Sequence, residues 1–114
     1  MAKTTVGFRE TVTIHGKNKS REVTARVDTG AAKSSIDSAL AKSLGLGPIV
    51  RYQKVRSAHG RSVRGMILAR VTMAGRTFKV FFTLADRRHM KYSVLIGRNI
   101  LKRGFVIDSA KKSG

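Results

Sequence analysis

Apolar and polar residues alternate along most of the chain, which is the period of half-buried β-strands. Residues 6–14 form the first such stretch, and its apolar members share one parity: Val6, Phe8, Val12 and Ile14. A polar turn follows at residues 15–19, and residues 22–27 resume the alternation. The pattern predicts a hairpin whose second strand ends directly before Asp28.

The rest of the chain predicts further short strands with two short helices between them. The strands are expected at residues 51–58, 61–73, 77–84, 94–96 and 105–108. Asp37 is a typical N-cap for a helix that runs to Leu44 and stops at Gly45, and residues 97–102 form a second short helix. Many short strands with regular turns predict an all-β fold, a small closed or nearly closed β-barrel with one or two short helices.

Length and composition fit one folded domain. The chain has 114 residues, of which 41% are hydrophobic, and it has no cysteine. We therefore expect a single domain at residues 1–108 and a frayed basic tail at residues 109–114. The N-terminal residues hold no apolar run that could act as a signal peptide. Because no segment reaches the roughly 18 apolar residues of a membrane span, a soluble, cytoplasmic protein is expected.

The net charge of +18 concerns the partners of the protein more than its fold. It favours three classes of partner: nucleic acid, an anionic membrane surface, and a strongly acidic protein or peptide. The basic residues are dispersed from Lys3 to Lys112, with no long basic block and no basic amphipathic helix. A membrane surface is therefore the least favoured of the three.

Residues 27–31, Val-Asp-Thr-Gly-Ala, place a carboxylate on a tight glycine turn directly after the predicted strand. Its carboxylate residue, Asp28, is one of only six acidic residues, against 24 Lys and Arg. Two such turns placed face to face would pair two carboxylates about 3 Å apart, which share one proton and can act as acid and base. An Asp before Gly is also common as a purely structural turn.

A second segment favours the catalytic alternative. Residues 94–101, Val-Leu-Ile-Gly-Arg-Asn-Ile-Leu, run from an apolar strand through Gly into a short helix. Together with the turn at residues 28–31 they resemble the retropepsin family of aspartic proteases, in which both motifs recur in this order. Residues 84–92 and 106–108 point to one group within this family. They are similar to the bacterial and archaeal retropepsin-like group labelled "ATP-dependent zinc protease", which is associated with ATP-grasp glutamate ligases.

The resemblance implies an acid-protease barrel and an aspartic peptidase that needs no cofactor. A retropepsin chain carries one Asp-Thr-Gly turn, as this chain does. The resemblance therefore implies a homodimer in which Asp28 of each copy activates the catalytic water. Thr29 would hydrogen-bond across the dimer, Gly30 would allow the sharp turn, and Ala31 would contact the substrate.

One departure from the retroviral pattern concerns the support of the turn. The resemblance implies that Arg98 and Asn99 hold the turn in place. In retroviral members the Arg pairs with an Asp, but Ala32 stands in that place here. We expect Asp86 or Asp108 to be the partner of Arg98 instead.

Basic residues near the predicted hairpin tip are the candidate substrate-binding residues. The hairpin at residues 57–61 occupies the place of the retroviral glycine-rich flap, but it has one glycine only. The candidates are Lys54, Arg56, His59, Arg61 and Arg64. Their side chains would neutralise a row of carboxylates, and the association with glutamate ligases implies a glutamate-rich or polyglutamylated peptide. A solvated basic face is the alternative.

No metal site is predicted. His15, His59 and His89 are far apart in the sequence, no His-Glu-x-x-His pattern occurs, and there is no cysteine. Solvated loop histidines are the expectation.

The rival class of function is a non-catalytic basic β-barrel that binds RNA or ribosomes. Small barrels of the OB type bind nucleic acid through stacking aromatic residues. This chain has five Phe, two Tyr and no Trp, and Phe78 and Phe82 fit the core. We expect no aromatic residue among the basic residues of the hairpin tip, so the peptidase is favoured.

Overall fold

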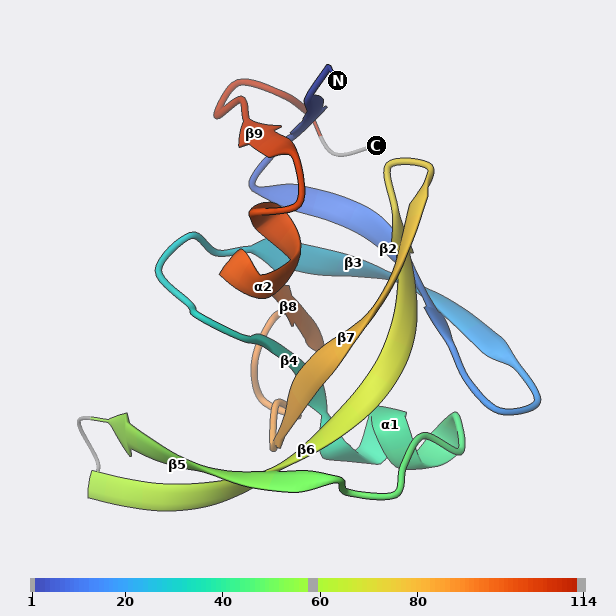
Figure 1. The fold of residues 1–114 in the computed structure, drawn as a ribbon, viewed down its shortest axis with the longest axis vertical. Coiled ribbons are helices and arrows are strands. Elements are labelled where there is room, and N and C mark those ends of the chain that lie inside the picture. The colour runs from blue at the N-terminus through green and yellow to red at the C-terminus, as the bar shows by residue number, and fades with distance from the viewer. Residues whose placement is uncertain (1, 58–59, 113–114) are drawn as a thin grey trace.

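A computed structural model gives the fold of residues 2–57 and 60–112. The main sheet closes on itself as a small barrel (Figure 1). Its strands are, in order around the barrel, β2 (Arg9–His15), β3 (Ser20–Val27), β8 (Val94–Ile96), β4 (Ser34–Asp37), β7 (Arg76–Ala85) and β6 (Gly60–Met73). Each pairs with the next, and β6 pairs back with β2. The predicted all-β fold, a small closed barrel with two short helices, is confirmed.

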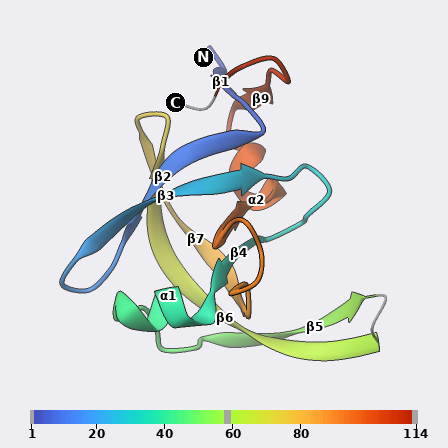
Figure 2. The ribbon, with the colours of Figure 1, turned by 180° about the vertical axis from the view of Figure 1, so that it is seen from behind.

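The remaining strands extend this barrel at two places. β5 (Arg51–Ser57) pairs only with the first half of β6 among the described residues, and the two form a ribbon that projects from the body. The predicted hairpin is confirmed, although its tip residue His59 lies outside the described residues. Figures 1 and 2 show that the ribbon and the loop after β3 project toward the same side of the molecule.

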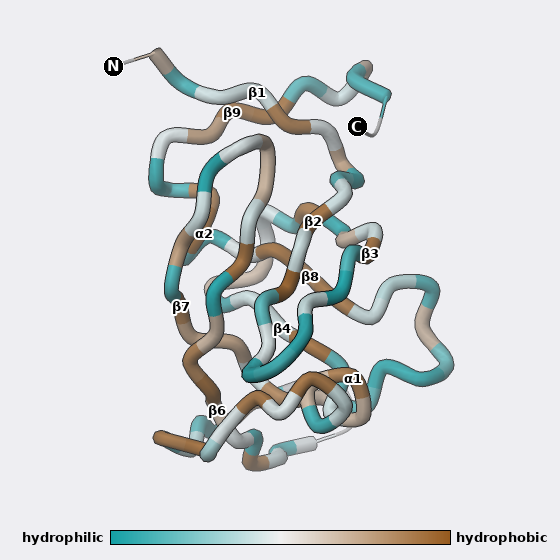
Figure 3. Tube along the Cα trace, turned by 90° about the vertical axis from the view of Figure 1, so that its right-hand side faces the viewer, coloured by the Kyte–Doolittle hydropathy of each residue, from teal (hydrophilic) through white to brown (hydrophobic). Residues whose placement is uncertain are grey.

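The core follows the predicted alternation in most strands. Phe78, Val80 and Phe82 on β7 are buried, and so are Val12 and Ile14 on β2. The short β8 is apolar and crosses the middle of the molecule (Figure 3). The strand that ends at Asp28 is thereby anchored to the most buried part of the fold.

The prediction of one continuous strand over residues 6–14 is wrong, because the chain bends at residues 7 and 8 and divides this stretch between β1 and β2. Phe8 is 56% exposed, whereas Glu10, which has the same parity, is 4% exposed. The Gly7 N–H donates to Glu10 Oε2 at 2.7 Å, and this contact bends the chain away from the line of β2. β1 (Thr4–Val6) therefore leaves the barrel and pairs in parallel with β9 (Phe105–Ile107).

The C-terminal tail is also packed where a frayed end was expected. The Lys111 ammonium lies 2.8 Å from Glu10 Oε2, and the Lys111 N–H donates to the Asp108 carbonyl. A buried carboxylate is costly without a partner, so this ion pair holds residues 109–111 against the start of β2. Residues 109–111 consequently lie near the small β1–β9 sheet (Figure 1).

The two predicted helices are present, and their ends lie within one residue of the predicted bounds. α1 (Ser38–Ser43) is capped by Asp37, whose carboxylate accepts the Leu40 N–H at 3.2 Å, and Gly45 follows with a φ of 67°. α2 (Arg98–Leu101) starts directly after Gly97. No helix within residues 2–57 and 60–112 is long and apolar enough to cross a membrane.

β4 was not predicted as a strand, because Ser34 and Ser35 gave it no apolar pattern. Both serines are buried in the structure. β4 lies between β7 and β8, so its backbone is paired on both edges. The Ser34 hydroxyl donates to Asn99 Oδ1 at 2.8 Å, which satisfies a polar group that would otherwise be costly to bury.

Candidate active site

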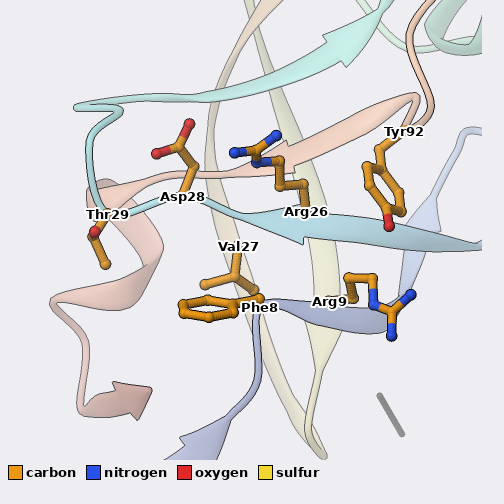
Figure 4. Close-up of a pocket in the computed structure, with 7 residues that line it drawn as sticks. All are labelled: Phe8, Arg9, Arg26, Val27, Asp28, Thr29 and Tyr92. Carbon is orange, nitrogen blue, oxygen red and sulfur yellow. The ribbon is translucent and has the colours of Figure 1, made fainter. Parts of the chain in front are cut away.

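The Asp28 turn is fixed to the barrel through its backbone. The Asp28 N–H donates to the Ile96 carbonyl of β8 at 2.9 Å, directly after β3 ends at Val27. The Gly30 N–H donates to Asp28 Oδ1 at 2.9 Å, so the turn orients its own carboxylate. In Figure 4 the Asp28 carboxylate points away from β3 on the side opposite to Val27 and Phe8.

A side chain at Gly30 would crowd the Asp28 carboxylate. A Cβ at this position would lie 3.2 Å from Asp28 Oδ1, a tighter approach than most side chains allow. The carboxylate would have to move, and the 2.9 Å hydrogen bond from Gly30 N–H would move with it.

The segment at residues 97–99 holds the turn in place through backbone hydrogen bonds to residues 31 and 32. The Arg98 N–H donates to the Ala31 carbonyl at 2.8 Å, and the Asn99 N–H donates to the Ala32 carbonyl at 3.2 Å. A Cβ on Gly97 would overlap the carbonyl group of Lys33. Only glycine therefore lets the start of α2 approach the turn this closely.

The Asn99 side chain, at the start of α2, joins the two strands β4 and β7. Its Oδ1 accepts the N–H and the hydroxyl of Ser34, at 3.0 and 2.8 Å. Its Nδ2 donates to the Phe81 carbonyl of β7 at 2.9 Å. The Ser34 hydroxyl in turn accepts the Gly97 N–H at 3.0 Å, which closes the network.

The partner expected for Arg98 is wrong. Its Nη1 donates to the Thr29 carbonyl at 2.9 Å, and neither Asp86 nor Asp108 contacts it within the described residues. With Ala32 in place of a carboxylate, the guanidinium uses a backbone carbonyl of the turn itself. Asp86 instead pairs with Arg88 at 2.9 Å, and the hydrogen bonds from Arg88 lower the pKa of Asp86.

Two cavities flank the turn. The first has a volume of about 410 Å³, and its lining residues are Phe8, Arg9, Arg26, Val27, Asp28, Thr29 and Tyr92 (Figure 4). Arg26 and Asp28 project from the same side of β3, and Arg9 stands opposite Arg26 in the β2–β3 register. Two arginines therefore line the cavity that Asp28 borders, and Arg26 is the one that lies on the Asp28 side of the strand in Figure 4.

The second cavity, of about 230 Å³, lies beyond the turn and under the ribbon. Its lining residues are Ala31, Ala32, Lys33, Ser35, Gln53, Val55, Arg64, Thr83, Arg87 and Leu95. Arg64 is opposite Gln53 in the ribbon, so the two side chains share the face that lines this cavity.

The other predicted ribbon residues lie on the opposite face. Lys54 is opposite Val63 and Arg56 is opposite Arg61, which places all three basic residues on the face away from the cavity. Tyr52 shares that face and is 67% exposed, so the expectation that no aromatic residue lies among these basic residues is wrong.

Arg87 is a site residue that the sequence did not indicate. It is only 8% exposed, its N–H donates to Asp37 Oδ1 at 2.8 Å, and its Nε donates to the Tyr92 carbonyl at 2.9 Å. Burial lowers the pKa of its guanidinium, with Arg64 and Arg26 acting in the same direction. Arg26 could have been found from the sequence, because a residue two positions before Asp28 on a strand shares its face.

The described histidines are dispersed. His15 hydrogen-bonds to Thr72 Oγ1 at 2.7 Å, and His89 is exposed in the loop before β8. Among residues 2–57 and 60–112, no three His, Asp or Glu side chains gather as a metal ion would need.

The closed barrel and its supported Asp-Thr-Gly turn define an aspartyl-protease-like domain. A family model described as gag-polyprotein putative aspartyl protease matches residues 11–103, and the chain belongs to this family. No curated protein matches the chain.

Solved structures of viral proteases have the same fold. EIAV protease, complexed with the inhibitor HBY-793, is 21% identical over 82% of this chain and 84% of its own, with a TM-score of 0.66. Simian foamy virus (mac) protease is 14% identical over 82% of this chain and 91% of its own, with a TM-score of 0.62. A Legionella pneumophila protein of unknown function is 17% identical over 96% of both chains, with a TM-score of 0.69. The predicted retropepsin-type barrel is confirmed, and the likeness to the "ATP-dependent zinc protease" group stays a prediction.

Proposed function

We propose that the protein is an aspartic endopeptidase whose catalytic pair is Asp28 from each of two copies. One observation carries this proposal. The Asp28 carboxylate stands at the mouth of a cavity on a turn that residues 97–99 hold by backbone and side-chain hydrogen bonds. A purely structural turn needs no such cavity, and the family to which the chain belongs supports the catalytic alternative.

The second carboxylate must come from another molecule, because the other acidic residues are engaged elsewhere. Glu10 pairs with Lys111 and Asp86 with Arg88, while both oxygens of Asp37 accept backbone N–H groups. Asp108 accepts the Ala110 N–H, and Glu22 is exposed on β3. A two-fold axis beside the turn would instead bring two Asp28 side chains together, with Thr29 bonding across the axis.

The paired carboxylates would act on a water between them. The ionised carboxylate takes a proton from the water as its oxygen attacks the scissile carbonyl carbon, and the protonated one donates to the carbonyl oxygen. Transfer of a proton to the amide nitrogen then lets the C–N bond break. Gly30 N–H, bonded to Asp28 Oδ1, keeps the carboxylate oriented during these steps.

Acidic peptides, glutamate-rich or polyglutamylated, are the substrates that the charge distribution favours. Arg9 and Arg26 line the cavity that Asp28 borders, and Arg64 and Arg87 line the other, which Ala31 also borders. Such groups pair well with carboxylates. Lys54, Arg56 and Arg61 on the outer face of the ribbon would add long-range attraction, and His59 is kept as a predicted substrate contact.

Replacing Asp28 tests the proposal. We expect Asp28→Asn to lower the cleavage of poly-α-glutamate by about a thousandfold or more, because an amide can neither accept nor share the proton. Cleavage is measured by the appearance of new amino groups. Glu22→Gln, an exposed carboxylate on the same strand, is the matched control and should retain the parent rate. Cleavage that persists in Asp28→Asn contradicts the dyad.

The RNA-binding alternative has one observation in its favour. Tyr52 is 67% exposed and lies on the same ribbon face as Lys54 and Arg56, so a base could stack beside two cations. Tight, salt-dependent binding of RNA without cleavage of any acidic peptide would support this alternative over the peptidase.

A further inference from the structure

We propose that the cavity between the Asp28 turn and the ribbon is a binding site for one glutamate side chain, whose carboxylate is bound by Arg87 and Arg64. The inference rests on the proposed function in taking the ligand to be part of a peptide substrate. It differs from a general basic surface because it assigns one carboxylate to one cavity.

Arg87 is a buried cation that lacks a carboxylate partner among the described residues. Its Nε donates to the Tyr92 carbonyl, which carries no net charge. Asp37 is its acidic neighbour, but both oxygens of Asp37 already accept N–H groups, from Leu40 and from the backbone of Arg87. A buried charge is normally paired, so an anion in the cavity would complete this site.

A second cation points into the same cavity from the ribbon. Arg64 lies opposite Gln53 on the inward face and makes no ion pair within the described residues. Its charge, with that of Arg26, lowers the pKa of the Arg87 guanidinium after the larger effect of burial. Two guanidinium groups that repel each other across a cavity attract a carboxylate placed between them.

The cavity walls fit a glutamate side chain. Val55, Leu95 and Ala31 line it with apolar surface, against which the methylene groups of glutamate can pack. Its volume of about 230 Å³ exceeds the roughly 30 Å³ of a single water. Glutamate reaches one methylene deeper than aspartate, so the cavity should prefer glutamate.

Gln53 adds an unused hydrogen-bond acceptor. Its Oε1 is buried and has no donor among residues 2–57 and 60–112. Gln53 belongs to the residues that line the cavity, so a rotation of its side chain would present this acceptor to a backbone N–H of a bound peptide. The cavity therefore offers cations for the side chain and an acceptor for the main chain.

The test measures binding in a form that cannot cleave. Asp28→Asn protein is titrated calorimetrically with tetraglutamate, tetra-aspartate and tetraglutamine, each acetylated and amidated at its ends. We expect tetraglutamate to bind most tightly and tetraglutamine most weakly. Adding Arg64→Gln or Arg87→Lys should weaken tetraglutamate binding by about tenfold or more, with little effect on tetraglutamine.

Two controls separate the cavity from the diffuse charge. Arg70→Gln removes an exposed arginine on the same strand, β6, at a different cavity, and should change affinity by less than about twofold. The double variant Arg56→Gln, Arg61→Gln removes two positive charges from the outer face of the ribbon. A loss equal to that of Arg64→Gln in either control overturns the assignment, and so does tetraglutamate binding that Arg64→Gln leaves unchanged. Because Arg64 is partly exposed, its variant decides the matter if Arg87→Lys fails to fold.

The outcomes also distinguish this inference from the proposed function. Binding that depends on Arg64 in a protein that cleaves nothing would support the glutamate site and contradict the peptidase. Cleavage of acidic and neutral peptides at equal kcat/KM, abolished by Asp28→Asn, would support the peptidase and overturn the glutamate site.

Discussion

At the scale of single residues, Asn99 contributes most to the shape of the candidate site. One amide accepts two hydrogen bonds from Ser34 and donates one to the Phe81 carbonyl, so it connects β4, β7 and α2 under the turn. Ser34 is buried, and without Asn99 its N–H and hydroxyl would have to find other acceptors. Unsatisfied buried groups cost more than the bonds they replace.

We expect Asn99→Ala to lower the free energy of unfolding by about 1–3 kcal/mol, because it leaves buried polar groups unpaired. Urea denaturation followed by circular dichroism measures this change. Asn18→Ala, in the exposed turn between β2 and β3, is the matched control and should stay within about 0.5 kcal/mol of the parent. Equal stability of both variants would contradict the role given to Asn99.

Site residues that belong to a local sequence motif could be predicted. Site residues whose role depends on neighbours from distant parts of the chain could not. The turn at Asp28 and Gly30 could be predicted from the local sequence, and the supporting segment after Gly97 from its resemblance to the retropepsin family. Arg87 gave no signal, because its burial arises from Asp37, fifty positions away in the chain. Arg64 could be named among the candidates, and its parity differs from that of Arg61, but only the structure of the ribbon shows that Arg64 is the one that faces the cavity.

At the scale of elements, the chain ends form a small parallel sheet that the sequence did not predict. Alternation continued through Phe8, but Gly7 and Glu10 bend the chain so that β1 pairs with β9. Lys111 then closes the arrangement through its ion pair with Glu10. Because Phe8, which follows β1 in the chain, borders the Asp28 cavity, this terminal sheet lies close to the candidate site.

We expect Lys111→Met to destabilise the protein by about 1–3 kcal/mol, because it leaves a buried carboxylate with a single N–H donor. The effect is smaller than for a fully buried pair, since the Lys111 side chain is 33% exposed. Thermal unfolding measures the change. Lys112→Met removes an exposed neighbouring charge and should leave the midpoint nearly unchanged. A similar loss in both variants would mean that the tail acts through overall charge alone.

At the scale of the whole molecule, the charge of +18 acts against the dimer that the peptidase needs. Two copies repel each other over about 30 Å at 0.01 M salt, and over only about 8–10 Å at physiological ionic strength. A polyanionic substrate in the shared cleft would neutralise part of both charges. Dimer formation and binding of an acidic peptide should therefore favour each other.

We expect Asp28→Asn protein to sediment mainly as a monomer at 0.01 M salt and increasingly as a dimer at about 0.15 M. Tetraglutamate should raise the dimer fraction at low salt, whereas tetraglutamine should not, because only the former carries compensating charge. Phe8→Asp, placed on the exposed apolar residue at the Asp28 cavity, should keep the protein monomeric under all these conditions and abolish cleavage when Asp28 is intact. Efficient cleavage by a strictly monomeric protein would contradict the shared dyad, since one chain supplies only one Asp-Thr-Gly turn.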